Sequence, residues 1–427
     1  MKIVKGFSKL SRAEKIEYIQ NNVPMVADLA RVANHYRHET NQALFDDFSE
    51  NTLSNFFLPY GVAPNFLIDG RMHVLPMVTE ESSVVAAAAR AASFWAKHGG
   101  FKTTIHDSIK IGHLWFQWSG DAKILHDLTS ELQIYLVASV KEITQSMDGR
   151  GGGIVDIQFI QQPELTNVWQ MQVSFKTADS MGANFINTCL EAMKEPLAKY
   201  FDEQNLPAVD IIMAILSNYT PDCLVTCEVS CEVEELAPYS TGLSPEDFAK
   251  RFQLAMDIAY HNTHRAVTHN KGIYNGIDAV VLATGNDFRA VEAAGHAFAS
   301  RDGQYRSLST CEISEEGEFK LSLTLPLSLG TVGGLTRLHP LAALSMEILE
   351  NPSAEKLMSI AAAAGLANNF SAVASLVTTG IQKGHMKLHL SNILTSFNAT
   401  PEERERTEAY FSDKTVSIQK VREFLNR

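Results

Sequence analysis

The chain has 427 residues, 45% of them hydrophobic, which exceeds the usual size of a single core and predicts two or three domains. Its formal net charge of −13 at pH 7 argues against a general nucleic-acid or anionic-membrane surface. No apolar run approaches bilayer-spanning length and the N-terminus lacks the apolar stretch of a signal peptide, so we expect a cytoplasmic protein that binds neither membranes nor nucleic acid.

The first hundred residues predict helices, then short strands, then a further helix. Residues 9–50 have a helical pattern, and Ser11 begins a capping box there. Residues 55–80 are rich in turn signals and are predicted to form short strands. Residues 84–97 are predicted to form a helix that Ser83 caps and a Gly-Gly pair terminates.

Near residue 105 the pattern changes, and strands begin to alternate with helices. The predicted strands are 114–118, 154–160 and 168–175, and the predicted helices are 122–147 and 180–203. This alternation predicts a compact α+β insert. Long helices and buried strands return over residues 219–375, including a strand at 319–325 and an Ala-rich helix at 353–367. A charged amphipathic helical region begins at Pro401.

Three of the five cysteines are spaced four residues apart, so a metal site must be considered. Cys223, Cys227 and Cys231 alternate with valines at the odd positions of this run, while the even positions are Leu, Thr, Glu and Ser. That period of two is typical of a half-buried strand with its thiols on the core face. The spacing fits no common zinc or iron–sulfur pattern, and the chain has no HExxH motif, so we expect no metal.

The most informative run extends over residues 266–290, where polar and charged residues interrupt a largely apolar sequence. Lys271 and Asp287 stand in it, and a buried lysine or aspartate is costly unless it is paired. Catalytic sites are where such groups collect. The alternative is a helix end, a turn and a buried strand with one structural ion pair, and the residue types alone do not decide between the two.

Neither standard phosphate-binding loop is present. The Gly-rich runs at residues 149–153 and 330–334 can cradle anions, although tight turns explain most such clusters. Residues 179–184, Asp-Ser-Met-Gly-Ala-Asn, follow a predicted strand and open a helix whose N-terminus offers N–H groups to a phosphate. A helix cap by Asp179 is the simpler explanation of the aspartate, but it leaves Met181 to Asn184 unexplained.

Five segments, in order and spanning nearly the whole chain, resemble the class II (bacterial-type) 3-hydroxy-3-methylglutaryl-CoA (HMG-CoA) reductase family. They are Glu50-Asn51 with Pro59 to Ala63, Glu80 to Ser83, Asp179 to Asn184, Thr268 to Gly272 with Thr284 to Asp287, and Gly384 to Met386. The resemblance implies an α+β fold in three parts. These are a large, mainly helical CoA- and substrate-binding domain with buried strands (1–107 and 219–375), an inserted small ferredoxin-like nucleotide domain (108–218) and a C-terminal helical flap (376–427).

The family reduces HMG-CoA to mevalonate and CoA with two nicotinamide cofactors, through mevaldyl-CoA and mevaldehyde. The implied catalytic residues are Lys271 as oxyanion stabiliser, Glu81 as proton donor, Asp287 as their electrostatic coupler and His385 as the acid that protonates the CoA thiolate. To donate a proton, Glu81 needs a raised pKa. The helix that begins just after Glu81 and the positive charge of Lys271 would lower this pKa, whereas burial and the negative charge of Asp287 would raise it.

The implied binding residues follow by position. For the substrate they are Ser83, Arg265, Asn275, Asn368 and Asn369, and for the cofactor Asp179, Met181, Gly182, Asn184, Asn218 and Gly333. NAD-preferring relatives carry an acidic residue where this chain has Thr144, with Ser146 and Arg150 nearby. Hydroxyls and a guanidinium accept a 2′-phosphate, so we expect NADPH in preference to NADH.

Two other functions are weighed against this one. A reductase of another acyl-CoA is disfavoured by Arg265 and Ser83, because an unbranched acyl chain has no distal carboxylate for them. A CoA- or nucleotide-binding protein without catalysis is disfavoured by the presence of all four catalytic residue types. The resemblance also implies a homodimer or higher homo-oligomer whose active sites are shared between subunits, with HMG-CoA and mevalonate as ligands.

Overall fold

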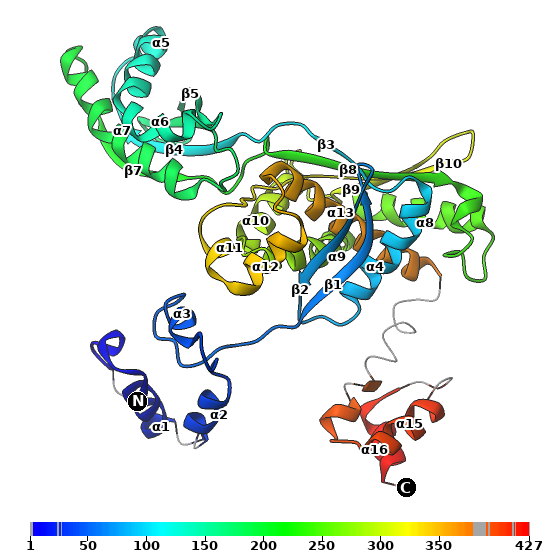
Figure 1. The fold of residues 1–427 in the computed structure, drawn as a ribbon. Coiled ribbons are helices and arrows are strands. Elements are labelled where there is room, and N and C mark those ends of the chain that lie inside the picture. The colour runs from blue at the N-terminus through cyan, green and yellow to red at the C-terminus, as the bar shows by residue number, and fades with distance from the viewer. Residues whose placement is uncertain are drawn as a thin grey trace. The chain divides into compact units, whose positions relative to one another are not determined.

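A computed structural model describes residues 3–23, 25–26, 28–378, 390–391, 393–411, 414 and 416–426 (Figure 1). The chain divides into two compact units, Met1–Pro59 and Tyr60–Arg427, each described here by itself. Helices and strands are mixed along the chain, which agrees with the expected α+β class. The three predicted domain boundaries remain predictions.

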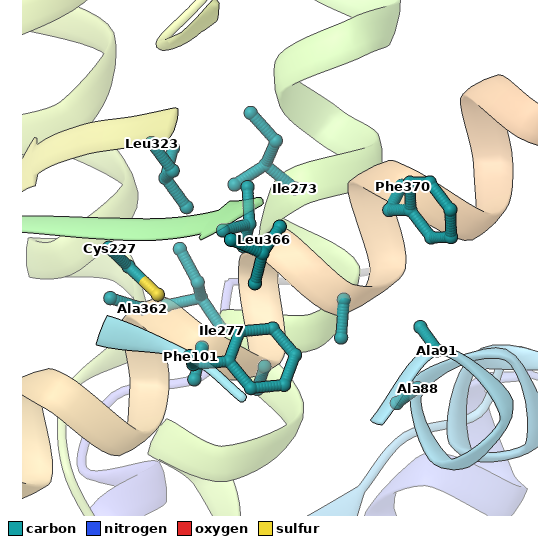
Figure 2. Close-up of a cluster of buried hydrophobic side chains, with 14 of the residues drawn as sticks. Ala88, Ala91, Phe101, Cys227, Ile273, Ile277, Leu323, Ala362, Leu366 and Phe370 are labelled. Atoms are coloured by element: carbon teal, nitrogen blue, oxygen red, sulfur yellow. The ribbon is translucent and has the colours of Figure 1, made fainter. Parts of the chain in front are cut away.

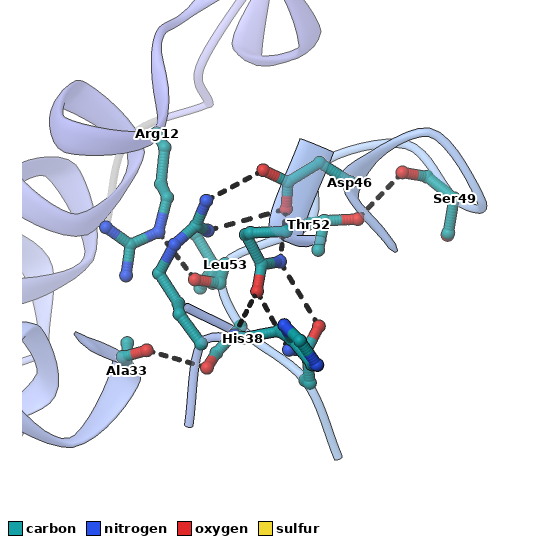
Figure 3. A network of polar contacts seen from close by, with 11 residues as sticks. Arg12, Ala33, His38, Asp46, Ser49, Thr52 and Leu53 are labelled. Carbon is teal, nitrogen blue, oxygen red and sulfur yellow. Dashed lines mark hydrogen bonds and ion pairs between the residues drawn. The ribbon is translucent and has the colours of Figure 1, made fainter. Parts of the chain in front are cut away.

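The first unit is built from short helices joined by side-chain hydrogen bonds. Its elements are η1 (Phe7–Lys9), α1 (Arg12–Asn22), α2 (Leu29–His35) and α3 (Gln42–Asp46). Ser11 caps α1 and completes the predicted capping box with Glu14. The Arg12 guanidinium donates to the Leu53 carbonyl at 2.6 Å, so the chain after α3 is tied to α1 (Figure 3).

The second unit contains a β-hairpin and two four-stranded sheets. The hairpin pairs β1 (Tyr60–Ile68) with β2 (Arg71–Val78). The first sheet has the order β3-β8-β10-β9, from β3 (Lys102–Ile105), β8 (Leu224–Glu232), β9 (Ser309–Ile313) and β10 (Glu318–Pro326). The second has the order β5-β6-β4-β7, from β4 (Lys110–Gln117), β5 (Gly153–Gln161), β6 (Val168–Lys176) and β7 (Asp210–Leu216).

The second unit also contains helices. They are α4 (Val84–Trp95), η2 (Ala96–His98), α5 (Ala122–Ser139), α6 (Lys141–Asp148), α7 (Ala183–Glu203), η3 (Val233–Leu236), α8 (Pro245–His261), α9 (Thr263–Ala283), α10 (Phe288–Ala299), α11 (Leu335–Leu338), α12 (Pro340–Ile348), α13 (Ala354–Val377), α15 (Pro401–Tyr410) and α16 (Ile418–Leu425). The predicted helix at 122–147 is interrupted at Val140, and the helix predicted to end at residue 367 continues to Val377.

The second sheet and its helices have the element order β-α-β-β-α-β, the order found in ferredoxin-like folds. All its strand pairs are antiparallel. Alternate residues of β6 are buried, because one face of the sheet packs on α5 and α7. This segment therefore has a hydrophobic core separate from that of the first sheet, as the alternating sequence pattern predicts.

The larger core is centred on α13, whose residues are buried on nearly every side (Figure 2). Leu366 and Ala362 of α13 lie beside Ile273 and Ile277 of α9, under the sheet strands that carry Cys227 and Leu323. The sequence led us to expect no segment of bilayer-spanning length, but α13 is long and apolar enough to cross a membrane by length and composition. However, 78% of the apolar stretch of this helix is buried inside the protein. An all-round apolar helix of this kind is typical of a protein interior.

The cysteine run forms β8, as its period of two predicts. Cys227 and Cys231 are buried and all five cysteines are free thiols. Among the described residues, no group of three or more His, Cys, Asp or Glu side chains is placed to hold a metal ion.

Candidate active site

The polar run at residues 266–290 forms two consecutive helices, so the buried strand of the alternative interpretation is wrong. α9 ends at Ala283, Gly285 turns the chain with a φ of 70°, and α10 begins at Phe288. Lys271, Asn275 and Asp278 are spaced at i, i+4 and i+7 and therefore share one face of α9. The opposite face of α9 carries apolar residues that pack in the core, and this packing fixes the orientation of the polar face.

Lys271 contacts Glu81, a residue 190 positions earlier in the chain, through an ion pair between its ammonium and the Glu81 carboxylate. The predicted burial of this lysine is wrong for the chain as described, because the Lys271 and Glu81 side chains are 59% and 38% exposed. Lys271 lies on the outward face of its helix, so the ammonium stays solvated and is available to a ligand.

Glu81 is presented by the turn before α4. Its backbone N–H donates to the Thr79 hydroxyl at 3.2 Å, and the helix begins three residues later at Val84. The N-cap residue Ser83 has a left-handed φ of 79° and its side chain makes no capping hydrogen bond, so the predicted cap is wrong. A non-glycine residue in this region is strained, and such strain is often kept at functional sites.

Asp287 is the N-cap of α10 and pairs with Arg289. Its carboxylate accepts from the backbone N–H groups of Arg289 and Ala290 at 3.0 and 3.3 Å and forms an ion pair with the Arg289 guanidinium at 2.9 Å. Partial burial raises the pKa of Asp287, but the hydrogen bonds from Arg289 and Ala290 outweigh it and hold the pKa below its ordinary value. Asp287 is therefore an ionised carboxylate, and the role of Arg289 was not anticipated from the sequence.

Asp278 is the buried carboxyl group of the run. Burial, together with the neighbouring carboxylates of Glu292 and Glu80, raises its pKa to about 8. The sequence pattern placed Asp278 in the informative run without giving it a role. The alternation of apolar and polar residues along α9 was the sequence signal that could have drawn attention to Asp278.

The predicted substrate residues have different surroundings. Arg265 and Asn275 are half-buried on α9, and burial lowers the pKa of the Arg265 guanidinium. Asn368 and Asn369 are buried within α13. The Asn369 amide contacts the Ser309 hydroxyl and the His269 imidazole at 2.9 and 3.1 Å. In this arrangement Asn369 connects α13 to β9 and α9 in the protein interior.

His269 is neutral in this network. Burial, with help from the nearby Arg265, lowers its pKa to about 3. Its Nε2 lies 2.7 Å from the Ser309 hydroxyl. Asn368 donates to the Ala364 carbonyl, one turn earlier in its own helix, at 3.3 Å.

The segment Asp179 to Asn184 forms the loop before α7 and the first two residues of that helix, and partners from two other segments hold it. Asp179 does not cap its own helix, as the simpler interpretation held, since its carboxylate accepts from the Ala354 N–H at the start of α13 at 2.8 Å. Gly182 is the N-cap of α7 with a φ of 94°, a conformation that favours glycine. The Asp179 carbonyl accepts from the Thr331 N–H at 2.8 Å.

Asn286 links the two functional segments. Its amide donates to the Gly330 carbonyl at 3.0 Å and accepts from the Gly330 N–H at 2.8 Å. Gly330 in turn approaches the backbone of Met181 so closely that a Cβ would overlap the Met181 nitrogen. The structure thus brings the turn before Asp287 and the predicted cofactor loop together through one asparagine.

Two cavities adjoin this loop. A small one of about 10 Å³ is lined by residues that include Met181, Asn218 and Ala290. A larger one of about 540 Å³ is lined by Asp179, Thr331, Val332, Thr336, Arg337, Ala343, Met346, Glu347, Asn351, Pro352 and Ser353. Gly333 and Asn184 are exposed beside these elements.

The residues predicted to select NADPH occupy α6 and the turn after it. Thr144 is only 2% exposed, and its hydroxyl donates to the Asp148 carboxylate at 3.0 Å. An i, i+4 contact on α6 therefore occupies the Thr144 hydroxyl, and its contact with a cofactor stays a prediction. Ser146 and Arg150 are exposed. His385 lies outside the described residues.

Comparisons with known proteins identify the family. A model of the hydroxymethylglutaryl-coenzyme A reductase family matches residues 11–390. A 3-hydroxy-3-methylglutaryl-coenzyme A reductase from Archaeoglobus fulgidus is 33% identical, over 99% of this chain and 94% of the relative. A probable 3-hydroxy-3-methylglutaryl-coenzyme A reductase from Borreliella burgdorferi is 30% identical, over 95% of this chain and 91% of the relative.

Solved structures give the same result. The reductase from Streptococcus pneumoniae has a TM-score of 0.75 and 35% identity, covering 99% of both chains. A class II enzyme from the same organism, bound to NADPH in open conformations, has a TM-score of 0.74 and 36% identity, covering 88% of this chain and 99% of that one. The family match, the length of these alignments and the Lys271–Glu81 contact lead to one conclusion: the chain belongs to the hydroxymethylglutaryl-coenzyme A reductase family.

Proposed function

We propose that this HMG-CoA reductase carries out the four-electron reduction of HMG-CoA to mevalonate and CoA with two NADPH, through mevaldyl-CoA and mevaldehyde. The observation that carries the proposal is the contact between Lys271 and Glu81. Both residues come from the motifs that resemble the family, and the fold joins them from distant parts of the chain.

Lys271 stabilises the oxyanion that forms when hydride adds to the substrate carbonyl. A preorganised ammonium is well suited to this, because it meets the developing charge without further reorganisation. Glu81 is the proton donor beside it, and the ionised Asp287 biases the charge balance of the pair. His385 protonates the departing CoA thiolate, and the C-terminal residues 376–427 act as a flap that brings it to the site.

The residues beside the cofactor loop fit NADPH. Arg150 and Ser146 are exposed and supply a cation and a hydroxyl for a 2′-phosphate. The cavity of about 540 Å³ beside Asp179 offers room for part of a dinucleotide. NADPH, when bound, supplies the hydrides. The loop Asp179 to Asn184, with Asn218 and Gly333, holds the cofactor in place.

The substrate is bound through its distal carboxylate. Arg265 forms the charged contact, because a guanidinium pairs with a carboxylate in a bidentate geometry. Ser83 and Asn275 add polar contacts, and Asn368 and Asn369 support the helices beneath them. We propose that the protein is cytoplasmic, and that it assembles as a homodimer or larger homo-oligomer whose subunits share active sites.

Replacement of Lys271 tests the proposal. Lys271→Ala should lower turnover of HMG-CoA by at least about 10²-fold, the usual loss on removing one oxyanion donor. Its midpoint of thermal unfolding should stay close to wild type, since exposed ion pairs contribute little stability. Lys123→Ala, an exposed lysine on α5, is the control and should keep full activity. Turnover of Lys271→Ala within twofold of wild type would refute the assigned role.

A further inference from the structure

Lys110, the first residue of β4, is a buried cation that the functional roles above do not use. The residue is only 3% exposed. A buried ammonium costs several kcal/mol unless its hydrogen bonds are replaced. Among the residues that the structure describes, no carboxylate lies within ion-pair distance of Lys110. Its hydrogen bonds must therefore come from neutral oxygen atoms, while the more distant Asp179 carboxylate favours the charged form.

Those oxygen atoms belong to Thr177, two residues before the predicted cofactor loop, and to Ser180 within that loop. The Lys110 ammonium donates to the Thr177 hydroxyl at 2.6 Å and to the Ser180 carbonyl at 2.8 Å. The Thr177 hydroxyl donates to the same Ser180 carbonyl at 2.6 Å. One cation therefore fastens both ends of the turn that leads into Met181 and Gly182.

The contact at Ser180 also sets the direction of the next peptide N–H. In a trans peptide the carbonyl and the following N–H point in opposite directions. With the Ser180 carbonyl turned toward Lys110, the Met181 N–H points away from it, to the side where Gly330 approaches. A Cβ on Gly182 would lie 2.6 Å from Thr177, so only glycine fits at this position of the turn.

The head of Lys110 also borders the small cavity next to Met181 and Asn218. Its volume of about 10 Å³ is close to the space that one water molecule needs. Thr220 lines the same cavity, is 2% exposed, and its hydroxyl has no hydrogen-bond partner among the described residues. Lys110 and Thr220 therefore supply polar groups beside the loop.

We propose that Lys110 is a positioning residue for the nicotinamide cofactor, which acts by holding the Ser180–Gly182 backbone in its binding conformation. The inference rests on the proposed cofactor role of this loop. Lys110 does not touch the reacting atoms, so its loss acts on cofactor binding more than on the chemical step.

The test compares Lys110→Met with Lys176→Met. Lys176 directly precedes Thr177 but is 44% exposed and paired with Asp107, so its replacement removes the same charge near the loop without removing the buried contact. Each variant is assayed for kcat, for KM of NADPH and of HMG-CoA, and for NADPH binding in the absence of HMG-CoA.

Lys110→Met should raise the KM and the Kd for NADPH by about tenfold, a factor typical of losing one charged hydrogen bond. The KM for HMG-CoA should stay within about twofold, because Arg265 and Lys271 are on a different element. Lys176→Met should behave as wild type. Thr177→Val removes the acceptor hydroxyl and should raise the KM for NADPH by a smaller factor. This variant replaces Lys110→Met in the test if Lys110→Met does not fold.

An unchanged KM for NADPH in Lys110→Met, or in Thr177→Val where the first variant does not fold, would overturn the inference. A parallel rise in both KM values with a loss of kcat would overturn it as well, because that pattern indicates general disruption. Failure of the proposed function is distinguishable, since wild-type protein would then show no NADPH binding and no HMG-CoA-dependent oxidation.

Discussion

At the scale of single residues, the motif residues and the proximity of Glu81 to Lys271 were predictable from the sequence, but other partners were not. Glu81 and Lys271 were identified separately, and their contact agrees with the expected pairing. The partnership of Asp287 with Arg289 and the burial of Thr144 depend on where helices α10 and α6 begin and which face they bury. A one-dimensional pattern does not specify those features.

Asp278 gives a prediction about stability and pH. Its pKa is raised to about 8 in the folded protein, so the folded chain retains a proton that the unfolded chain has released. This group therefore lowers stability increasingly as pH rises from about 4 to about 8. Asp278→Asn removes the titration and should increase the free energy of unfolding at pH 8 by on the order of 2 kcal/mol, with little gain near pH 4.

Urea unfolding of wild type and Asp278→Asn between pH 4 and 9 measures this effect. Asp257→Asn, an exposed carboxyl on α8, is the matched control and should leave the pH profile of stability unchanged. Identical profiles for Asp278→Asn and wild type would show that the carboxyl is ionised in the folded protein.

Arg150 carries the prediction on cofactor choice. Because Thr144 is buried, the exposed guanidinium of Arg150 is the main group left for a 2′-phosphate. Arg150→Ala should raise the KM for NADPH by about tenfold and leave the KM for NADH unchanged, since NADH has no 2′-phosphate. Parallel steady-state assays with both cofactors decide the matter, and a wild-type preference for NADH would contradict it.

At the scale of elements, close helix packing determines where Lys271 lies. Gly276 of α9 touches the backbone of α13 so closely that a Cβ would overlap the Ala364 carbonyl, and Gly365 of α13 similarly faces Ile277. Gly276 is a helix breaker in the sequence and stands in the run that was open to interpretation as a helix end and a strand. Gly276 and Gly365 allow α9 and α13 to approach each other closely, and this contact is visible only in the folded structure.

Gly276→Ala should separate these helices and destabilise the protein by about 1–3 kcal/mol, the usual cost of overpacking a core. Gly272→Ala is the control on the same helix, because a Cβ there meets nothing within 4 Å. It should be neutral or stabilising by up to about 1 kcal/mol through helix propensity. Thermal and urea unfolding measure both, and equal stability of the two variants would contradict the packing argument.

At the scale of the whole molecule, the sequence predicted the mixed fold class and the α+β segment with its own core. Both follow from hydrophobic periodicity, which is local. The tie between Asn286 and Gly330, and the use of Asp179 to hold α13, join residues far apart in sequence. They were not predictable because single polar residues give no signal about distant partners.

The stoichiometry of the reaction tests the central claim most directly. Purified protein is supplied with HMG-CoA and NADPH, and the oxidation of NADPH is followed together with the release of free CoA thiol. A four-electron reduction requires two hydrides for each thioester, so two NADPH should be oxidised for each thiol released, with both signals lost in Lys271→Ala. NADPH oxidation that does not depend on HMG-CoA, or a ratio of one NADPH to one thiol, would contradict it.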